Sequence, residues 1–326
     1  MKAVITGGAG FLGRLLAESL FRRGRLVDRH GGLSNIDEIV LFDSIENQER
    51  LDPRVREVTG SICDEESVAD AITEEVDSVF HLAAVVSGEA EADFEKGMAV
   101  NLTGTLNVLE ACRRLSHSPR VVFTSSVAAF GGELPSLIRD NTATTPRSSY
   151  GVQKVIGEQL LNDYSRKGFI DGRALRLPTV CVRPGPPNKA ASGFASSIVR
   201  EPIDGAIAVC PVPPETLMWL MSPNTAVANL IYAHELPAAA FGYQRTLNLE
   251  GLTMSVGDMV AALRSVCGEA VEARVEWRRD PGVEAVVSTW PGRFDSARAR
   301  ELGFRTDPDF ETLIRDYLMS RADPAR

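Results

Sequence analysis

The chain has 326 residues, of which 44% are hydrophobic and 24% charged, and a formal net charge of -9. The acidic balance argues against a nucleic-acid partner, since such proteins present clustered Lys and Arg to phosphates, and no apolar run approaches the ~18 residues of a membrane helix. Five scattered cysteines without a CxxC pair argue against disulfides or a zinc site. With an apolar start too short for a signal peptide, we expect a cytoplasmic protein with a small-molecule partner and no metal.

Short β-rich runs alternate with helix-patterned segments through the first half of the chain. The expected strands are Ala3–Thr6, Glu38–Phe42, Arg54–Val58, Ser78–Leu82, Arg120–Thr124 and Ala174–Leu177. The expected helices, where apolar positions recur with helical spacing, are Leu12–Arg23, Glu66–Thr73, Phe94–Leu115 and Tyr150–Arg166. Strands separated by helices form parallel βαβ units. The first half therefore predicts an α/β fold in which helices cover both faces of a doubly wound parallel sheet.

The pattern changes after Leu177, where prolines recur from 178 to 214. This composition predicts a loop-rich region. The elements expected after it are a helix at Asn224–Glu235, a strand near Thr246–Leu249, a helix near Val256–Val266, strands near Val271–Trp277 and a helix near Glu311–Met319. Residues 1–178, rejoined by about 223–250, should form the sheet domain. Residues 179–222 and 251–326 should form a smaller, loop-rich substrate lobe.

A glycine-rich turn joins the first strand to the first helix. In the run Thr6-Gly7-Gly8-Ala9-Gly10-Phe11-Leu12-Gly13, Gly7 permits the tight turn, Gly10 lets the backbone approach a pyrophosphate, and Gly13 lets the helix pack closely on the sheet. The phosphates would lie at the positive end of the helix. An ordinary glycine-rich turn is the alternative, but the order of strand, turn and helix favours a Rossmann dinucleotide site.

Asp43 ends the strand that follows and is the candidate ligand for the adenosine ribose. Its carboxylate can accept hydrogen bonds from both ribose hydroxyls and would repel a 2′-phosphate, which favours NAD over NADP. The gap from the glycines is longer than the usual ~20 residues, because residues 25–35 look like an insertion. A solvated aspartate at a strand end is the alternative.

Three side chains form the candidate catalytic set. Tyr150 and Lys154 are four residues apart on an expected helix and so share one face. A neighbouring ammonium and an oxidised nicotinamide both favour an ionised phenol, so Tyr150 can act as a general acid and base. Ser126 closes a buried strand and could hold the substrate oxygen during hydride transfer. A helical tyrosine with an exposed lysine is the alternative that the glycine turn argues against.

Together with His81-Leu82-Ala83-Ala84 and Asn101-Leu102-Thr103-Gly104-Thr105, these motifs resemble the extended short-chain dehydrogenase/reductases over nearly the whole chain. The resemblance implies that Phe11 and Leu12 main-chain groups meet the pyrophosphate and that Lys154 also holds the nicotinamide ribose. The other implied cofactor contacts are Ser61 and Ile62 at the adenine, and Leu82, Ala83, Ala84, Asn101, Tyr150 and Pro178. Ser61 departs from the family, where many members carry an aspartate that reads the adenine amine. His81 and Asn101 could equally be buried polar groups satisfied by the backbone.

The cofactor motifs do not identify the reaction, because the family includes sugar-nucleotide epimerases and dehydratases. Dehydratases of the family generally place an acidic pair after the catalytic hydroxyl, whereas residues 127–129 here are Val-Ala-Ala. Many sugar-nucleotide enzymes carry an Arg-Asp pair and a Val-Asp before the helix that corresponds to Asn224–Glu235, whereas residues 218–223 here are Met-Trp-Leu-Met-Ser-Pro. A dehydrogenase without that diphosphate anchor is therefore the favoured interpretation.

Within the family, residues 176–185, 188–192 and 200–202 resemble members that oxidise the C2 hydroxyl of a four-carbon sugar acid. Arg183 and Arg200 are the candidates for binding the carboxylate, because a guanidinium can donate two hydrogen bonds to it; either could instead be solvated. The other candidate substrate contacts are Ser87, Gly88, Asn188 and Ser192, with Ser126 and Tyr150 at the hydroxyl.

Two other functions remain open from the sequence. A UDP-sugar epimerase would keep its NAD permanently and produce no net NADH, and a non-catalytic Rossmann protein would sense the NAD redox state and signal to a partner. A homodimer through the helices Phe94–Leu115 and Tyr150–Arg166 is a further expectation from related folds.

Overall fold

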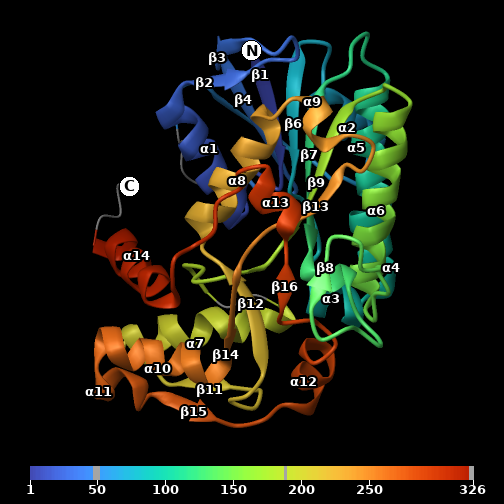
Figure 1. Cartoon of the computed structure of the whole chain (residues 1–326). Helices are drawn as coiled ribbons and strands as arrows, with labels where there is room; N and C mark the ends of the chain where they lie inside the picture. The colour runs from blue at the N-terminus through green and yellow to red at the C-terminus, as the bar shows by residue number, and fades with distance from the viewer. Residues whose placement is uncertain (47–51, 187–188, 323–326) are drawn as a thin grey trace.

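A central parallel sheet organises the larger domain (Figure 1). The computed structural model describes residues 1–46, 52–186 and 189–322. The sheet order is β13-β9-β7-β6-β1-β4-β5, and its strands are β1 (Lys2–Thr6), β4 (Glu38–Asp43), β5 (Val55–Thr59), β6 (Val76–His81), β7 (Arg120–Ser126), β9 (Asp171–Leu177) and β13 (Thr246–Asn248). The chain runs outward from β1 to β5 and returns to β6 on the other side of β1. The carboxyl ends of β1 and β6 thus form the switch point at which doubly wound sheets bind ligands.

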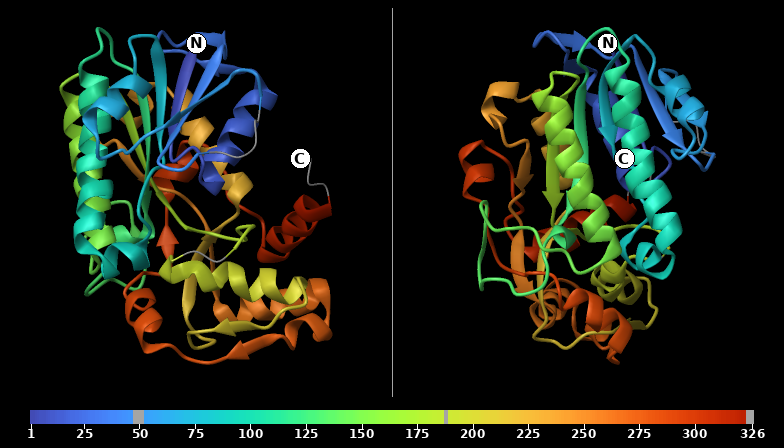
Figure 2. Two further views of the ribbon diagram at one scale, coloured as in Figure 1. Left: turned by 180° about the vertical axis from the view of Figure 1, so that it is seen from behind. Right: turned by 90° about the vertical axis from the view of Figure 1, so that its right-hand side faces the viewer.

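Helices cover both faces of this sheet, as predicted (Figures 1 and 2). One face is covered by α1 (Phe11–Arg23) and α8 (Pro223–Glu235), and the other by α2 (Glu65–Ala71), α5 (Gly104–Arg113) and α6 (Ser149–Arg166). Leu20 and Leu230 pack on the first face and Val108 and Leu161 on the second, each almost inaccessible to solvent. Burying one such aliphatic side chain contributes about 1.5–3 kcal/mol. The doubly wound α/β prediction is confirmed.

The helix expected at Phe94–Leu115 is interrupted in the structure. A short α3 (Ser87–Ala92) and α4 (Phe94–Gly97) precede a turn of π-helix, η1 (Met98–Thr103), which leads into α5. The Asn101 side chain in η1 binds the backbone of Val85, accepting from its N–H at 2.8 Å and donating to its carbonyl at 3.0 Å. This tertiary contact holds the π-helical turn against the segment that follows β6. The helical spacing of apolar residues does not predict such a contact.

The smaller lobe has its own core, built on residues that come from both sides of α8. Ile198, Met259 and Ile314 are fully buried at its centre, on three separate helices. The elements of the lobe are β10 (Thr179–Val180), η3 (Ala191–Gly193), α7 (Phe194–Ile203), β11 (Ala208–Cys210), β12 (Leu217–Met221), β14 (Leu252–Ser255), α10 (Val256–Cys267), α11 (Glu269–Glu272), β15 (Val275–Trp277), α12 (Pro281–Val287) and α14 (Phe310–Ala322).

Three details of the lobe differ from the sequence expectation. The region predicted to be loops contains α7, whose Pro202 lies in the last turn, where it interrupts little of the helix. The strand expected at Val271–Trp277 begins only at Val275, because 269–272 form α11. Finally, α13 (Ala297–Glu301) packs in the core of the sheet domain through Ala299, not in the substrate lobe.

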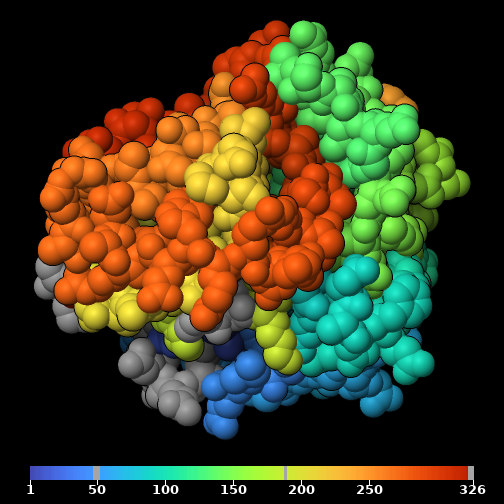
Figure 3. All heavy atoms as spheres, turned by 90° about the horizontal axis from the view of Figure 1, so that it is seen from below, coloured from blue at the N-terminus to red at the C-terminus, as the bar shows by residue number. Residues whose placement is uncertain are grey.

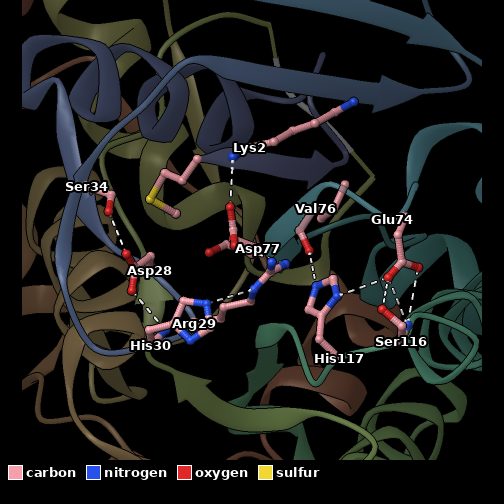
Figure 4. Close-up of polar contacts among 12 residues, drawn as sticks. Lys2, Asp28, Arg29, His30, Ser34, Glu74, Val76, Asp77, Ser116 and His117 are labelled. Carbon is pink, nitrogen blue, oxygen red and sulfur yellow. Dashed lines mark hydrogen bonds and ion pairs between the residues drawn. The ribbon is translucent and has the colours of Figure 1, made fainter.

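The insertion at residues 25–35 forms a hairpin of β2 (Arg25–Val27) and β3 (Leu33–Asn35), which lies at the amino ends of the strands (Figure 4). Asp77 fastens it: its carboxylate lies 3.5 Å from the Arg29 guanidinium and accepts a hydrogen bond from the Lys2 N–H at 3.2 Å. These contacts lie at the edge of the sheet opposite the switch point. The insertion therefore lengthens the path from the glycine turn to β4 without entering the ligand edge.

The remaining short elements are η2 (Val127–Ala129), β8 (Ile138–Arg139), α9 (Ala238–Phe241) and β16 (Phe294–Asp295). Strand β16 pairs with β8, so the two lobes are also joined by backbone hydrogen bonds. Within the part of the chain that the structure describes, none of the helices is both long enough and apolar enough to cross a bilayer.

Candidate active site

A cavity of about 320 Å³ lies at the carboxyl ends of β1, β6 and β7, between the sheet domain and the smaller lobe. Residues from the glycine turn, the ends of three strands, the start of α6 and the smaller lobe meet around it. Of the residues predicted from the sequence, those that line it are Gly7, Gly10, Phe11, Leu12, Gly13, Leu82, Ala84, Ser87, Ser126, Tyr150, Lys154, Pro178, Arg183 and Ser192. The structure thus brings the glycine turn and the candidate catalytic set into one site.

The glycine turn has no room for a side chain at Gly7 or Gly13. Gly7 has φ +72°, and a Cβ there would lie 2.8 Å from the Ala83 nitrogen; a Cβ on Gly13 would lie 2.3 Å from the Gly7 carbonyl oxygen. Gly10 is the N-cap of α1, and no side chain caps this helix end. The N-terminal N–H groups of α1 therefore have no side-chain cap, and Phe11, Leu12 and Gly13 line the cavity, which fits a dinucleotide pyrophosphate.

Asp43, at the end of β4, is held beside this turn. One carboxylate oxygen accepts a hydrogen bond from the Ala9 N–H at 3.0 Å and the other from the Ile45 N–H at 3.2 Å. Each oxygen keeps a further lone pair, so the group can still accept from two ribose hydroxyls. At the predicted adenine position, the Ser61 hydroxyl accepts from the Cys63 N–H at 3.2 Å, and Ile62 is buried against Gly104.

Tyr150 enters the site from the first turn of α6. The Ser148 hydroxyl caps the helix by accepting from the Gly151 N–H at 3.2 Å, and a Cβ on Gly151 would lie 2.1 Å from the Ala128 carbonyl oxygen. The start of α6 therefore seats directly on η2, which follows Ser126. Burial raises the pKa of Tyr150 to about 12, while a hydrogen bond with Ser126 and the charge of Arg183 act in the opposite direction. In the protein alone, burial outweighs the charges that favour the phenolate.

Lys154 lies one turn further along α6 and is almost completely buried. Its ammonium is 4.7 Å from the centre of the Phe123 ring and 5.5 Å from the centre of the Tyr150 ring. Burial lowers the pKa of Lys154 to about 7, against the opposing effect of the Glu158 carboxylate. A proton on Lys154 is therefore exchangeable near neutral pH, in a place where aromatic faces attract the charged form.

Glu158 and Arg176 form a buried ion pair behind this set, which sequence reasoning missed. The Arg176 guanidinium donates to both Glu158 carboxylate oxygens, at 2.6 and 2.9 Å, and the Ser125 hydroxyl donates to the same carboxylate at 2.5 Å. The network ties the ends of β7 and β9 to α6, and so fixes Ser126 relative to Lys154. The i, i+4 spacing from Lys154 was the sequence signal that could have indicated Glu158.

His81 and Asn101 are buried and hydrogen-bonded within the protein. His81 lies 2.7 Å from the Thr6 hydroxyl and 2.9 Å from that of Thr105, and burial lowers its pKa to about 3. Besides its two bonds to Val85, Asn101 donates to the Gln153 side chain at 2.8 Å. Neither lines the cavity within the described residues. Their observed contacts hold together the strand and helices that form its floor.

The two candidate carboxylate ligands have different surroundings. Arg183 lines the cavity, and burial lowers the pKa of its guanidinium. Arg200 instead donates to the Arg183 carbonyl at 2.8 Å and to Glu201 at 2.7 Å, and it is absent from the cavity wall among the described residues. Arg200 therefore holds the backbone of Arg183, while Arg183 faces the site.

The turn after β6 contacts the loop at residues 189–192, which lies beside the site. The Ser87 hydroxyl accepts a hydrogen bond from the Ala191 N–H at 3.2 Å, and a Cβ on Gly88 would lie 2.4 Å from the Lys189 carbonyl oxygen. Ser192 follows on the cavity wall. Asn188, the remaining predicted substrate contact, lies outside the described residues. Trp290, which follows α12, also lines the cavity and was not predicted, because no local pattern brings it there.

Comparison with known proteins identifies relatives of this chain. The chain is 53% identical to D-erythronate dehydrogenase of Cupriavidus necator over 98% of both chains, and 46% identical to D-erythronate dehydrogenase of Haemophilus influenzae over 98% of this chain and 99% of the relative. Among solved structures, it resembles a nucleoside-diphosphate-sugar epimerase from Agrobacterium tumefaciens with a TM-score of 0.91 and 40% identity, covering 99% of this chain and 94% of the other.

Residues 3–219 match the NAD dependent epimerase/dehydratase family. The match spans the glycine turn, Asp43, the catalytic set and Arg183. NAD is the cofactor of this family, and it is also the cofactor that fits the glycine turn before α1. The chain belongs to the NAD dependent epimerase/dehydratase family.

Proposed function

We propose that this protein is an NAD-dependent dehydrogenase that oxidises the C2 hydroxyl of D-erythronate to 2-dehydro-D-erythronate, a 2-oxo acid. The observation that carries the proposal is the composition of the cavity wall. Ser126, Tyr150 and Lys154 share it with the guanidinium of Arg183, and no carboxylate lines it among the described residues. An anionic hydroxy acid meets a positive group there and no like charge, and the two close relatives named D-erythronate dehydrogenase support the choice of acid.

The chemistry is divided among the residues of the wall. The glycine turn and Asp43 would hold NAD, which would supply the acceptor for the hydride from C2. Ser126 Oγ holds the substrate hydroxyl beside the Tyr150 hydroxyl, and Tyr150 Oη takes the hydroxyl proton as general base. Lys154 Nζ, under the Tyr150 ring, gives the phenolate a positive neighbour when it is protonated. The buried ion pair of Glu158 and Arg176 holds these groups in position relative to one another.

Arg183 is the proposed ligand of the substrate carboxylate. Its side chain lines the cavity, and its backbone is fixed from both sides: the N–H donates to Ser196 Oγ at 3.0 Å and the carbonyl accepts from Arg200 at 2.8 Å. Because its backbone is already fixed, Arg183 has only side-chain freedom to lose when it binds a carboxylate. Arg200 acts through Arg183, as a positioning residue.

A sugar-nucleotide epimerase is the second candidate, because the structural relative from Agrobacterium tumefaciens is named as one. The position at which many such enzymes carry an Arg-Asp pair is occupied here by β12, a buried strand in which Met218, Trp219 and Leu220 are inaccessible to solvent. A diphosphate has no cation to bind on such a strand, which favours the dehydrogenase.

One experiment separates the two functions. The purified protein is incubated with NAD and a panel of four- to six-carbon aldonates, uronates and UDP-sugars, NADH is followed by absorbance, and products are identified by mass spectrometry. We expect NADH and a 2-oxo acid from D-erythronate. An isomerised UDP-sugar without NADH would establish the epimerase, and NADH from uronates alone would keep the reaction class but reject erythronate.

The arginine assignment has its own kinetic test. Arg183→Ala should raise KM for the acid about 10- to 100-fold, the scale of a lost buried charged hydrogen bond, with little change in KM for NAD. Arg183→Lys, which keeps the charge but loses the planar fork, should fall between. Equal KM values for the acid in all three proteins would place the carboxylate elsewhere, on donors such as Ser87 and Ser192.

A homodimer is proposed through α5 and α6, which lie side by side on one face (Figure 2). Leu106 on α5 and Val152 on α6 are exposed apolar side chains, 38% and 42% accessible. Light scattering should give twice the chain mass, and Leu106→Glu with Val152→Glu should give a monomer. A location in the cytoplasm remains a prediction of the sequence.

A further inference from the structure

Trp290 reaches the catalytic cavity from the far end of the chain. It lines the cavity together with Tyr150 and Arg183. Among the described residues of the cavity wall, it is the one that follows Ser192 in sequence. The segment that carries it runs from α12 to β16. An aromatic ring delivered to a substrate site by the smaller lobe is well placed to limit the shape of what binds there.

Trp290 also lines a second cavity, of about 430 Å³. This cavity is formed by Gly132 and residues 134–136, which follow η2, by Leu217, and by residues 288–293. Within the part of the chain that the structure describes, Trp290 is the residue that the walls of these two cavities share. In Figure 3 the orange-red segment near residues 280–295 lies between yellow residues of the smaller lobe and the green loop near residue 135.

The segment around Trp290 is anchored on both sides. A Cβ on Gly292 would lie 2.5 Å from Leu217 Cβ, so the chain passes directly against β12. Phe294 stacks on Trp219 with 3.6 Å between ring centres, and the Arg293 carbonyl accepts a hydrogen bond from the Ile138 N–H at 3.0 Å. Before Trp290, α12 packs against η3. With its chain neighbours fixed in this way, the indole is in a position to act as a partition between the cavities.

Apolar packing of the ring, and not a hydrogen bond from the indole N–H, holds Trp290 in place. Its Nε1 is buried without a hydrogen-bond partner among the described residues, while the ring packs against the core of the smaller lobe. A buried donor without an acceptor costs free energy, so nothing is lost when that donor is removed. A phenylalanine at this position would keep most of the partition.

We propose that Trp290 sets the length of the acid that this enzyme accepts, by closing the substrate end of the catalytic cavity. This inference rests on the proposed function. With the carboxylate at Arg183 and C2 at Tyr150, two neighbouring carbons of the acid are fixed, and the rest of the chain has to fit in the space that the indole limits. Removing the indole joins the site to the second cavity and provides room for carbons beyond C4.

The test compares Trp290→Ala with Trp290→Phe. For each protein, kcat/KM is measured with four-carbon and six-carbon aldonates. The six-to-four ratio should rise about 10-fold or more in Trp290→Ala and stay within about threefold of wild type in Trp290→Phe, since even one extra methylene group in a pocket is worth about 10- to 200-fold and the six-carbon acid is longer by two carbons. KM for NAD should be unchanged in both. An unchanged ratio in a folded Trp290→Ala protein overturns the proposal.

A binding measurement separates this inference from the proposed function. Dissociation constants of the same two acids, in the presence of NAD, are obtained from thermal shifts for each variant, and Trp290→Leu replaces Trp290→Ala if the latter does not fold. If wild type oxidises no aldonate but the affinity ratio shifts in the alanine variant, the proposed reaction fails and the partition stands. If turnover occurs and neither ratio shifts, the partition fails and the reaction stands.

Discussion

At the scale of single residues, burial decides the ionisation of the candidate catalytic groups. Burial raises the pKa of Tyr150 to about 12 and lowers that of Lys154 to about 7, so both groups are driven toward their neutral forms. The charges that would shift Tyr150 back are Arg183 and, once bound, the cofactor. Formation of the phenolate therefore depends on what occupies the site, which suits a base that is needed only in the ternary complex.

Tyr150→Phe tests the role of the phenol. Turnover should fall about 100-fold or more, the usual scale for losing a general acid and base, while NAD binding, followed by fluorescence titration, should be nearly unchanged because the ring remains. Tyr164→Phe is the matched control on the same helix: its hydroxyl donates to Glu110, away from the cavity. Wild-type turnover in Tyr150→Phe would remove the phenol from the mechanism.

Lys154→Met should lower both NAD affinity and turnover, because the proposed role of its ammonium is to bind the nicotinamide ribose as well as to stabilise the phenolate. It should also stabilise the fold. The pKa of Lys154 is lowered from 10.5 to about 7, so the folded state binds fewer protons than the unfolded state between these values, and wild-type stability rises with pH across that window. Below pH 7 the buried charge costs its full amount. Urea unfolding at pH 6, 7 and 9 should show a smaller rise for the variant, and an identical pH dependence in both proteins would contradict the assignment.

At the scale of elements, close backbone approaches place the site more firmly than side-chain bonds do. The start of α6 seats on η2 through Gly151, α1 seats on its own turn through Gly13, and α3 meets the substrate loop through Gly88. In each case a Cβ would lie within 2.5 Å of a carbonyl oxygen. Such contacts leave the two elements little room for a side chain between them, and catalytic geometry is sensitive to displacements of about 1 Å.

Gly88→Ala tests one of these approaches. Its Cβ would collide with the Lys189 carbonyl oxygen and displace the loop that carries Ser192, so KM for the acid should rise about 10-fold. KM for NAD, whose proposed anchors are the glycine turn and Asp43, should stay within about twofold. Gly32→Ala is the control, because a Cβ there meets only the Asp28 side chain, at 3.4 Å, in the remote hairpin. Equal rises in both KM values would indicate a general loss of structure.

At the scale of the whole molecule, the sheet domain contains buried neutral histidines that make its stability depend on pH. His81 lies between β1 and α5, and His234, at the end of α8, is hydrogen-bonded to Ser78 on β6 at 2.7 Å. Burial lowers the pKa of both, that of His81 to about 3. At a pH between the folded and unfolded pKa values, each histidine is protonated in the unfolded chain and neutral in the folded protein.

Acid should therefore destabilise the protein below the unfolded histidine pKa of 6.5. For His81 the loss of unfolding free energy develops as pH falls from 6.5 toward 3, and at pH 5 it amounts to about 2 kcal/mol. Urea unfolding of wild type and of His81→Gln between pH 4.5 and 7.5 measures it. The variant should be less stable at pH 7.5 but show a shallower decline, and parallel curves would contradict this source of the pH dependence.

The sequence by itself determined the features that are encoded locally. The glycine turn, Asp43 at a strand end, and the spacing of Tyr150 and Lys154 are each contained in a few consecutive residues, and parallel βαβ units have a strong periodic signal. These segments sufficed to predict the doubly wound sheet, the cofactor, and a site shared by the glycine turn and the catalytic set.

Only the tertiary structure decided the features that depend on distant segments. It directed Arg183 toward the cavity and Arg200 toward the Arg183 backbone, although both arginines looked equivalent in sequence. It paired Glu158 with Arg176, and it brought Trp290 to the cavity more than 100 residues after the catalytic helix. The physical reason is that a side chain's direction and partner are set by which surfaces pack together, and this packing is a property of the whole chain.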